Sequence, residues 1–209
     1  MSLFRYISHA NVVKDPEVPV PRWGLDDTGR RRVATLAEQP WLSTVDRFVC
    51  SAETKAIETA TILAERWQRP IEIRPETGET DRSATGYVPE ARHAELAARY
   101  FAEPARSADG WETAIDGQLR VIEALADLLV EPGPDPAAAD GVRTRPDIAV
   151  IGHGGVGTLL WCHLAGAAID QANDQPGQGH YWTWDRSTGA MLHRWHPIDA
   201  AEQPPSPPA

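Results

Sequence analysis

Residues 148–157 read Ile148-Ala149-Val150-Ile151-Gly152-His153-Gly154-Gly155-Val156-Gly157, and this stretch decides the fold. Its continuous apolar run predicts a central, parallel strand over 148–151. The glycines that follow predict a turn into a helix over 156–165, and the backbone N–H groups at such a helix start form an anion site. Ligands of α/β sheets bind beyond the carboxyl ends of the strands, so His153 is a candidate site residue.

Apolar runs typical of strands alternate with helical patterns along the rest of the chain. Further strands are predicted at Leu3–Ser8, 47–50 and 70–74, with a closing hairpin of 181–185 and 191–195 around 187–189. Further helices are predicted from Asp26 onward and over 53–67 (capped by Ser51), 90–101 and 112–130. This order predicts a three-layer α/β/α domain with a mostly parallel central sheet and an antiparallel finish.

Proline-rich segments set the expected limits of the domain. Residues 1–198 are expected to form one domain, and the tail 199–209 is expected to be disordered. The prolines and glycine of residues 131–147 predict a flexible surface connection. Residues 15–23, which also contain three prolines, predict an irregular loop after the first strand.

The bulk properties exclude several classes of function. A net charge of -10 over 209 residues lacks the broad basic face that nonspecific nucleic-acid binding needs. No stretch approaches the length of a membrane span, so a cytoplasmic location is the default expectation. Cys50 and Cys162 lie in apolar runs and are expected to be buried. The residues show no metal-type spacing, and we expect no cofactor.

A second histidine ends a second predicted strand. His9 follows Leu3–Ser8, so two imidazoles from distant parts of the chain are expected to share one site. A third element, Ser51 followed by Lys55, forms a strand-to-helix turn with a cation in the first helical turn. Lysine opposes the helix dipole there, which makes sense if Lys55 faces a bound anion.

Four motifs therefore follow one another along the chain: Ser8-His9-Ala10, Ser51 with Lys55-Ala56-Ile57-Glu58-Thr59-Ala60, Glu79-Thr80-Asp81-Arg82, and Val150-Ile151-Gly152-His153-Gly154-Gly155. Together they resemble the histidine phosphatase superfamily, which has the phosphoglycerate mutase-like fold. Residues 23–29 also resemble the family's Leu-Thr-x-x-Gly segment. The resemblance runs from Leu3 to about Trp195, in the family's order.

The resemblance implies a phosphohydrolase that acts on a small phosphorylated substrate without a metal. By position, His9 would be the nucleophile that becomes phosphohistidine, and His153 would donate a hydrogen bond to the phosphoryl oxygens. Glu79 would protonate the leaving oxygen and then activate water, a role that calls for a raised pKa. Glu76 and Asp81 are close rivals for the acid.

The chain departs from the family at two positions. Ser8 and Lys55 stand where the family clamps phosphate with two arginines, and lysine lacks the bidentate fork of arginine. Another cation would have to compensate: Arg82 is preferred because it shares a loop with Glu79, and Arg5 is the weakest candidate. The predicted phosphate-binding set is Ser8, Lys55, Arg82, Asn11 and Arg22.

Three other functions remain as alternatives. A catalytically degenerate module would bind a phosphorylated ligand without turnover. A mutase is less favoured, because retention of a dianion needs the missing arginines. Residues 152–157 also fit the dinucleotide pattern G-x-G-x-x-G, but they come late in the chain and lack the acidic partner that ribose binding needs. The sequence leaves the substrate and the oligomeric state open.

Overall fold

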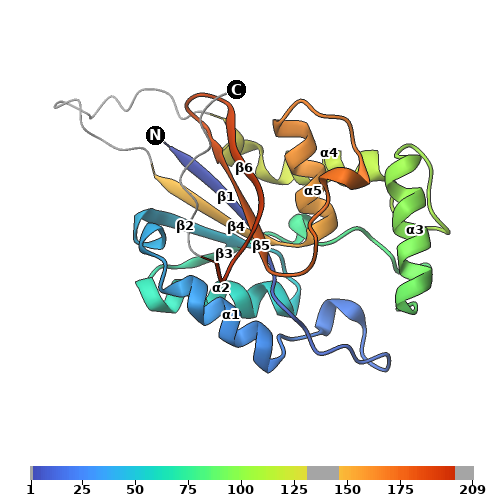
Figure 1. The fold of residues 1–209 in the computed structure, drawn as a ribbon, viewed down its shortest axis with the longest axis horizontal. Coiled ribbons are helices and arrows are strands. Elements are labelled where there is room, and N and C mark those ends of the chain that lie inside the picture. The colour runs from blue at the N-terminus through green and yellow to red at the C-terminus, as the bar shows by residue number, and fades with distance from the viewer. Residues whose placement is uncertain (1, 131–145, 201–209) are drawn as a thin grey trace.

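The computed structural model describes residues 2–130 and 146–200 (Figure 1). In this part of the chain a six-stranded sheet has the order β3-β2-β4-β1-β5-β6. The strands are β1 (Leu3–Ser8), β2 (Val45–Cys50), β3 (Ile71–Ile73), β4 (Asp147–Gly152), β5 (His180–Asp185) and β6 (Ala190–Pro197). The first four are parallel and the last two form the antiparallel finish, as predicted.

Helices cover both faces of this sheet (Figure 1). The helices are α1 (Asp27–Ala37), α2 (Thr54–Trp67), α3 (Glu90–Ala102), α4 (Ala114–Leu129) and α5 (Gly154–Leu164). Helices α1 and α2 pack on one face through a core that includes Phe48 and Ile151, and α4 and α5 pack on the other through one that includes Tyr6 and Val150. The predicted three-layer α/β/α architecture is confirmed. None of the described helices is long and apolar enough to cross a bilayer.

The register of the parallel strands gathers the candidate residues at one edge. Ser8 pairs with Gly152, and Cys50 pairs with Ile151, so β1, β2 and β4 end side by side. The next residues along the chain are His9, Ser51 and His153, which therefore meet at the carboxyl edge of the sheet.

Some boundaries differ from the sequence predictions. Helix α5 begins at Gly154 rather than Val156, because its first glycines already adopt helical backbone. Glu53, not Ser51, is the N-cap of α2, and no side chain caps that helix. Residues 131–145 of the predicted flexible connection and 201–209 of the predicted disordered tail lie outside the described residues. Within that connection, Asp147 belongs to β4.

Candidate active site

Two buried imidazoles form the centre of the candidate site. The ring centroids of His9 and His153 are 5.3 Å apart, and His9 is 7% exposed. The Nδ1 atom of His9 lies 2.9 Å from the carbonyl oxygen of Ala10, which can only accept, so Nδ1 carries the proton. Burial, and then the neighbouring His153, lower the pKa of His9 to about 3. His9 is therefore neutral at physiological pH, with the lone pair on Nε2.

His153 is anchored on two sides. Its Nε2 atom lies 2.7 Å from the hydroxyl of Ser51, which also accepts from the backbone N–H of Glu53 at 3.4 Å. The backbone N–H of His153 donates to the Tyr6 hydroxyl, which donates in turn to the His153 carbonyl (2.9 and 3.1 Å). Burial lowers the pKa of His153. Among the described residues, its buried Nδ1 atom has no hydrogen-bond partner.

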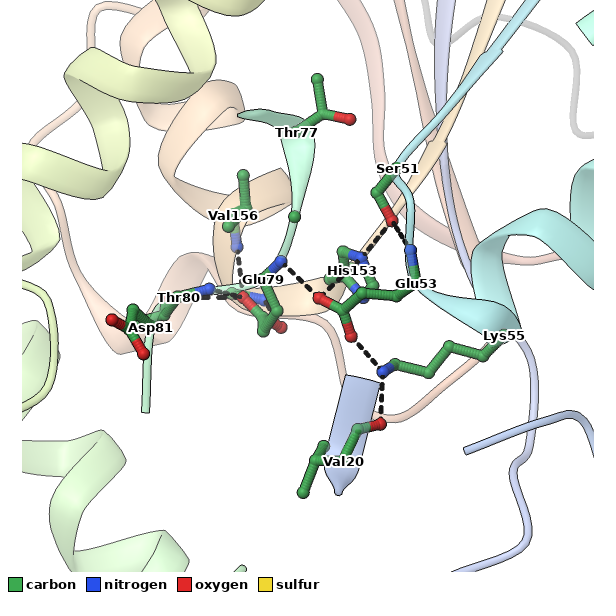
Figure 2. Close-up of polar contacts among 12 residues, drawn as sticks. Val20, Ser51, Glu53, Lys55, Thr77, Glu79, Thr80, Asp81, His153 and Val156 are labelled. Atoms are coloured by element: carbon green, nitrogen blue, oxygen red, sulfur yellow. Dashed lines mark hydrogen bonds and ion pairs between the residues drawn. The ribbon is translucent and has the colours of Figure 1, made fainter. Parts of the chain in front are cut away.

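Glu79 lies at the amino end of α5, against His153 (Figure 2). Its carboxylate accepts hydrogen bonds from the backbone N–H groups of Thr80 (2.9 Å), Gly155 (3.2 Å) and Val156 (3.1 Å). Burial alone would raise the pKa of Glu79, but Arg82, His153 and the Thr80 and Gly155 N–H groups outweigh it and lower the pKa to about 2. The role of an acid predicts a raised pKa, whereas this carboxyl is ionised in the free protein.

The glycine-rich turn is packed by the protein's own side chains. A Cβ atom on Gly155 would lie 2.8 Å from Glu79 Oε1, and one on Gly154 would lie 2.0 Å from Gln175 Nε2. The sequence predicts an anion site at the backbone N–H groups of this helix start. Glu79 occupies this position, because the helix start attracts the nearest carboxylate, and the Gln175 amide packs against Gly154. Because Glu79 and Gln175 already pack against the glycines, the structure does not support dinucleotide binding at this turn.

Glu53 is the main residue of the site that the sequence analysis did not single out. Its Oε1 atom accepts from the backbone N–H of Glu79 (2.9 Å) and lies 3.4 Å from His153 Nε2, while its Oε2 atom forms an ion pair with Lys55 (Figure 2). Lys55 is 4% exposed and also donates to the Val20 carbonyl at 3.1 Å. Lys55 therefore reaches the site, but its charge is already matched by a buried carboxylate.

Arg82 lies beside Glu79 but faces helix α3. Its guanidinium contacts His93 Nε2 at 2.5 Å and lies over the Trp111 ring, with its Cζ atom 5.4 Å from the centroid. Its charge acts on Glu79 and contributes to the lowered pKa of that residue. Of the three candidate replacement arginines, Arg82 is thus the one tied electrostatically to the predicted acid.

The other predicted phosphate-binding residues have different partners. Ser8 is fully buried; its hydroxyl donates to Gln175 Oε1 at 2.5 Å and accepts from the backbone N–H of His180 at 3.1 Å. Asn11 accepts a hydrogen bond from Arg32 at 2.8 Å. Arg22 is exposed in the short helix Val20–Arg22, next to the Val20 carbonyl that Lys55 binds.

Arg5 and the two rival acids lie outside this cluster. Arg5 pairs with Asp147 at the start of β4, the opposite end of that strand from His153. Glu76 is exposed, and the Asp81 carboxylate accepts from the backbone N–H of Ser83 within its own loop. Glu79 is thus the one of the three rivals that contacts the turn carrying His153.

Arg120 of helix α4 holds the loop that carries Glu79. It donates to the carbonyl oxygens of Glu76 (2.6 Å), Gly78 (3.0 Å) and Glu79 (3.4 Å), and it forms an ion pair with Glu112 at 2.7 Å. A guanidinium spans these acceptors because its five N–H groups point in fixed directions. The sequence offered no signal for Arg120, which reads as one more polar residue on an amphipathic helix.

The chain is similar to a known protein family and to several solved structures. The model of the histidine phosphatase superfamily (branch 1) matches residues 18–184, a range that begins after His9. No curated protein sequence matches the chain. Among solved structures, mycobacterial hydrolase 1 is 17% identical (TM-score 0.72; 97% of this chain and 100% of that chain covered).

Two further solved structures share the fold. A mycobacterial glucosyl-3-phosphoglycerate phosphatase in complex with inorganic phosphate is 18% identical, with a TM-score of 0.72 over 96% of this chain and 98% of that one. The Entamoeba histolytica phosphoserine phosphatase in complex with 3-phosphoglyceric acid is 13% identical, with a TM-score of 0.64 over 94% and 98%.

Proposed function

The chain belongs to the histidine phosphatase superfamily (branch 1), and we propose that it is a phosphohydrolase that cleaves a small phosphomonoester through a phosphohistidine at His9. The observation that carries the proposal is the state of His9. Its proton is fixed on Nδ1 by the Ala10 carbonyl, so Nε2 presents a lone pair at the carboxyl edge of the sheet. His153 and Glu79 both lie near the His9 ring.

In the first step, the Nε2 lone pair of His9 attacks phosphorus and the bond from phosphorus to the leaving oxygen breaks. The Glu79 carboxyl gives its proton to that oxygen, which leaves as an alcohol. Glu79 must be protonated for this step, and a bound phosphoryl group raises its pKa, because adjacent negative charges disfavour each other. The unpartnered Nδ1 of His153 offers a hydrogen-bonding position for a phosphoryl oxygen.

In the second step, the Glu79 carboxylate takes a proton from water, whose oxygen bonds to phosphorus. The bond from phosphorus to Nε2 breaks, the electron pair returns to His9, and inorganic phosphate leaves. Lys55 and Arg82 would balance the charge of the phosphoryl oxygens, together with Ser8, Asn11 and Arg22 if these residues turn toward the ligand.

A second function, binding of a phosphorylated ligand without turnover, is favoured by one observation. The buried Lys55, at a position where the family has arginine, is already paired with Glu53. A weaker clamp lowers the stabilisation of the transition state, on the order of 10²–10³ in rate for a lost donor. Such a site would still hold phosphate.

The test is hydrolysis of a mixed panel of phosphomonoesters by wild type and His9→Ala, each with and without EDTA. We expect turnover that survives EDTA and disappears in the variant. Mass spectrometry after an alkaline quench should show one added phosphoryl group on the wild-type peptide that contains His9. Phosphate binding without turnover or phosphohistidine would establish the binding module instead, and binding of NAD(P) would revive the oxidoreductase.

A further inference from the structure

The carboxylate of Glu53 has no task in the proposed reaction, yet it lies inside the site. Its side chain is 14% exposed and contacts three groups around the reaction centre: the Lys55 ammonium, His153 Nε2 and the backbone N–H of Glu79. These groups come from α2, from the turn after β4 and from the loop after β3, so Glu53 links three of the segments that build the site (Figure 2).

The charges of the described site balance without a ligand. Lys55 and Arg82 are positive, Glu53 and Glu79 are negative, and burial keeps His9 and His153 neutral. A phosphoryl group with two negative charges would lie close to the two negatively charged carboxylates of Glu53 and Glu79. The repulsion between these like charges would weaken binding. A phosphoryl group with one negative charge and one P–O–H group would meet less repulsion and could donate its proton to a carboxylate.

We propose that Glu53 makes this site selective for the singly protonated, monoanionic form of a phosphomonoester. The Glu53 carboxylate accepts the hydrogen bond of the phosphoryl hydroxyl, while Lys55 donates to an unprotonated phosphoryl oxygen. This inference rests on the proposed phosphohydrolase function and specifies the form of its substrate.

The need for a proton supports the same form of substrate. Glu79 is ionised in the free protein, since its pKa lies at about 2, but the first step requires a protonated acid. A monoanionic substrate brings one more proton than a dianionic one. When the hydroxyl turns from Glu53 to Glu79, transfer of its proton to Glu79 would leave a dianionic phosphoryl group and the protonated Glu79 that the first step needs, with no proton taken from solvent.

The experiment uses two phosphonates that resist hydrolysis and differ little in shape, benzylphosphonate and α,α-difluorobenzylphosphonate. Fluorine lowers the second pKa, so at a pH between the two values the first is largely a monoanion and the second a dianion. Calorimetric titration gives the affinity ratio for wild type, Glu53→Gln and Glu53→Asp. Glu65→Gln, an exposed change on the same helix, is the matched control.

We expect wild type to favour benzylphosphonate by about tenfold, and Glu53→Gln to lose or reverse this preference. Glu53→Asp, which keeps the charge, and Glu65→Gln should retain it. An identical ratio in wild type and Glu53→Gln would overturn the role of Glu53, and so would the absence of binding of either probe. Hydrolysis that depends on His9, measured in the same preparation, then shows whether the phosphohydrolase function holds even if the role of Glu53 fails.

Discussion

Glu79 accepts a hydrogen bond from the backbone N–H of Gly155 at 3.2 Å, so a carboxylate of one loop caps the amino end of the helix that follows the second histidine. The contact joins the predicted acid to the turn that carries His153. It also means that the positive end of α5 holds Glu79 ionised until a ligand changes the local charge. The predicted acid therefore lies within the predicted anion site rather than beside it.

Glu79→Gln should separate the two chemical steps. With p-nitrophenyl phosphate, we expect a burst of about one equivalent of nitrophenolate, since this leaving group departs without a proton. Turnover should then fall by about 10²–10⁴, because no base activates water. With an alkyl phosphate, even the burst should be absent. Stopped-flow absorbance measures the nitrophenolate burst, quenched-flow assay of the released alcohol measures the burst with the alkyl substrate, and phosphate release measures turnover.

Glu76→Gln is the control for this experiment. It removes a carboxylate of the same loop, but that side chain is exposed. The control should match wild type in both phases. Equal loss of the burst with the aryl and alkyl substrates in Glu79→Gln would contradict a proton-transfer role for Glu79.

Arg120→Lys should lower kcat more than it changes KM. The guanidinium binds three carbonyl oxygens of the loop that ends in Glu79, and a single ammonium cannot reach them all. We expect kcat to fall about tenfold and the free energy of unfolding to fall by about 1 kcal/mol, since two partly buried carbonyl oxygens lose their donor. Arg106→Lys, at an exposed ion pair with Glu103, should change neither quantity. A rise in KM alone would argue that Arg120 binds substrate rather than positions the loop.

The sequence was sufficient for the architecture because burial and periodicity are local signals. Leu3–Ser8 is a strand in both the prediction and the structure, and the continuous apolar run over 148–151 lies in the middle of the sheet. The order of the strands then follows from parallel crossovers, which bring His9 and His153 to one edge. These statements need no knowledge of side-chain partners.

The partners themselves could not be read from the sequence. Glu53 stands in a polar strand-to-helix turn, where a carboxylate is ordinarily exposed at a helix start. Its burial depends on Lys55, on the Val20 carbonyl and on the N–H of Glu79, which come from three segments. Likewise, the sequence of residues 152–157 predicts an anion site, but it does not predict that the carboxylate of Glu79 occupies that site.

Tyr6→Phe should destabilise the fold beneath the site. The buried Tyr6 hydroxyl both accepts from the N–H and donates to the carbonyl of His153, so its loss leaves the buried N–H without a partner, while the carbonyl keeps its bond from the Gly157 N–H. We expect the free energy of unfolding to fall by about 1–3 kcal/mol in urea denaturation. Tyr87→Phe, at a residue that is 42% exposed, should leave the stability unchanged. An unchanged stability in Tyr6→Phe would mean that water replaces the hydroxyl.

The stability of the protein should fall as the pH falls below 6.5. Burial and His153 lower the pKa of His9 from 6.5 to about 3 in the folded state. Between these values the unfolded chain binds a proton that the folded protein does not, so the free energy of unfolding decreases toward acid pH, by about 1.4 kcal/mol per unit for one histidine. His153, whose pKa is also lowered, adds to the same slope.

Urea denaturation at pH 7.5 and pH 5 measures this slope. His9→Gln cannot take up the proton, so its loss of stability between the two pH values should be smaller than that of wild type by about 2 kcal/mol. His163→Gln controls for the removal of a histidine at an exposed position. The carboxyl groups of Glu53 and Glu79 have lowered pKa values, so their contribution is lost only at more acid pH. Parallel curves for wild type and His9→Gln would show that His9 keeps an ordinary pKa in the folded protein, and would contradict the claim that burial holds its imidazole neutral.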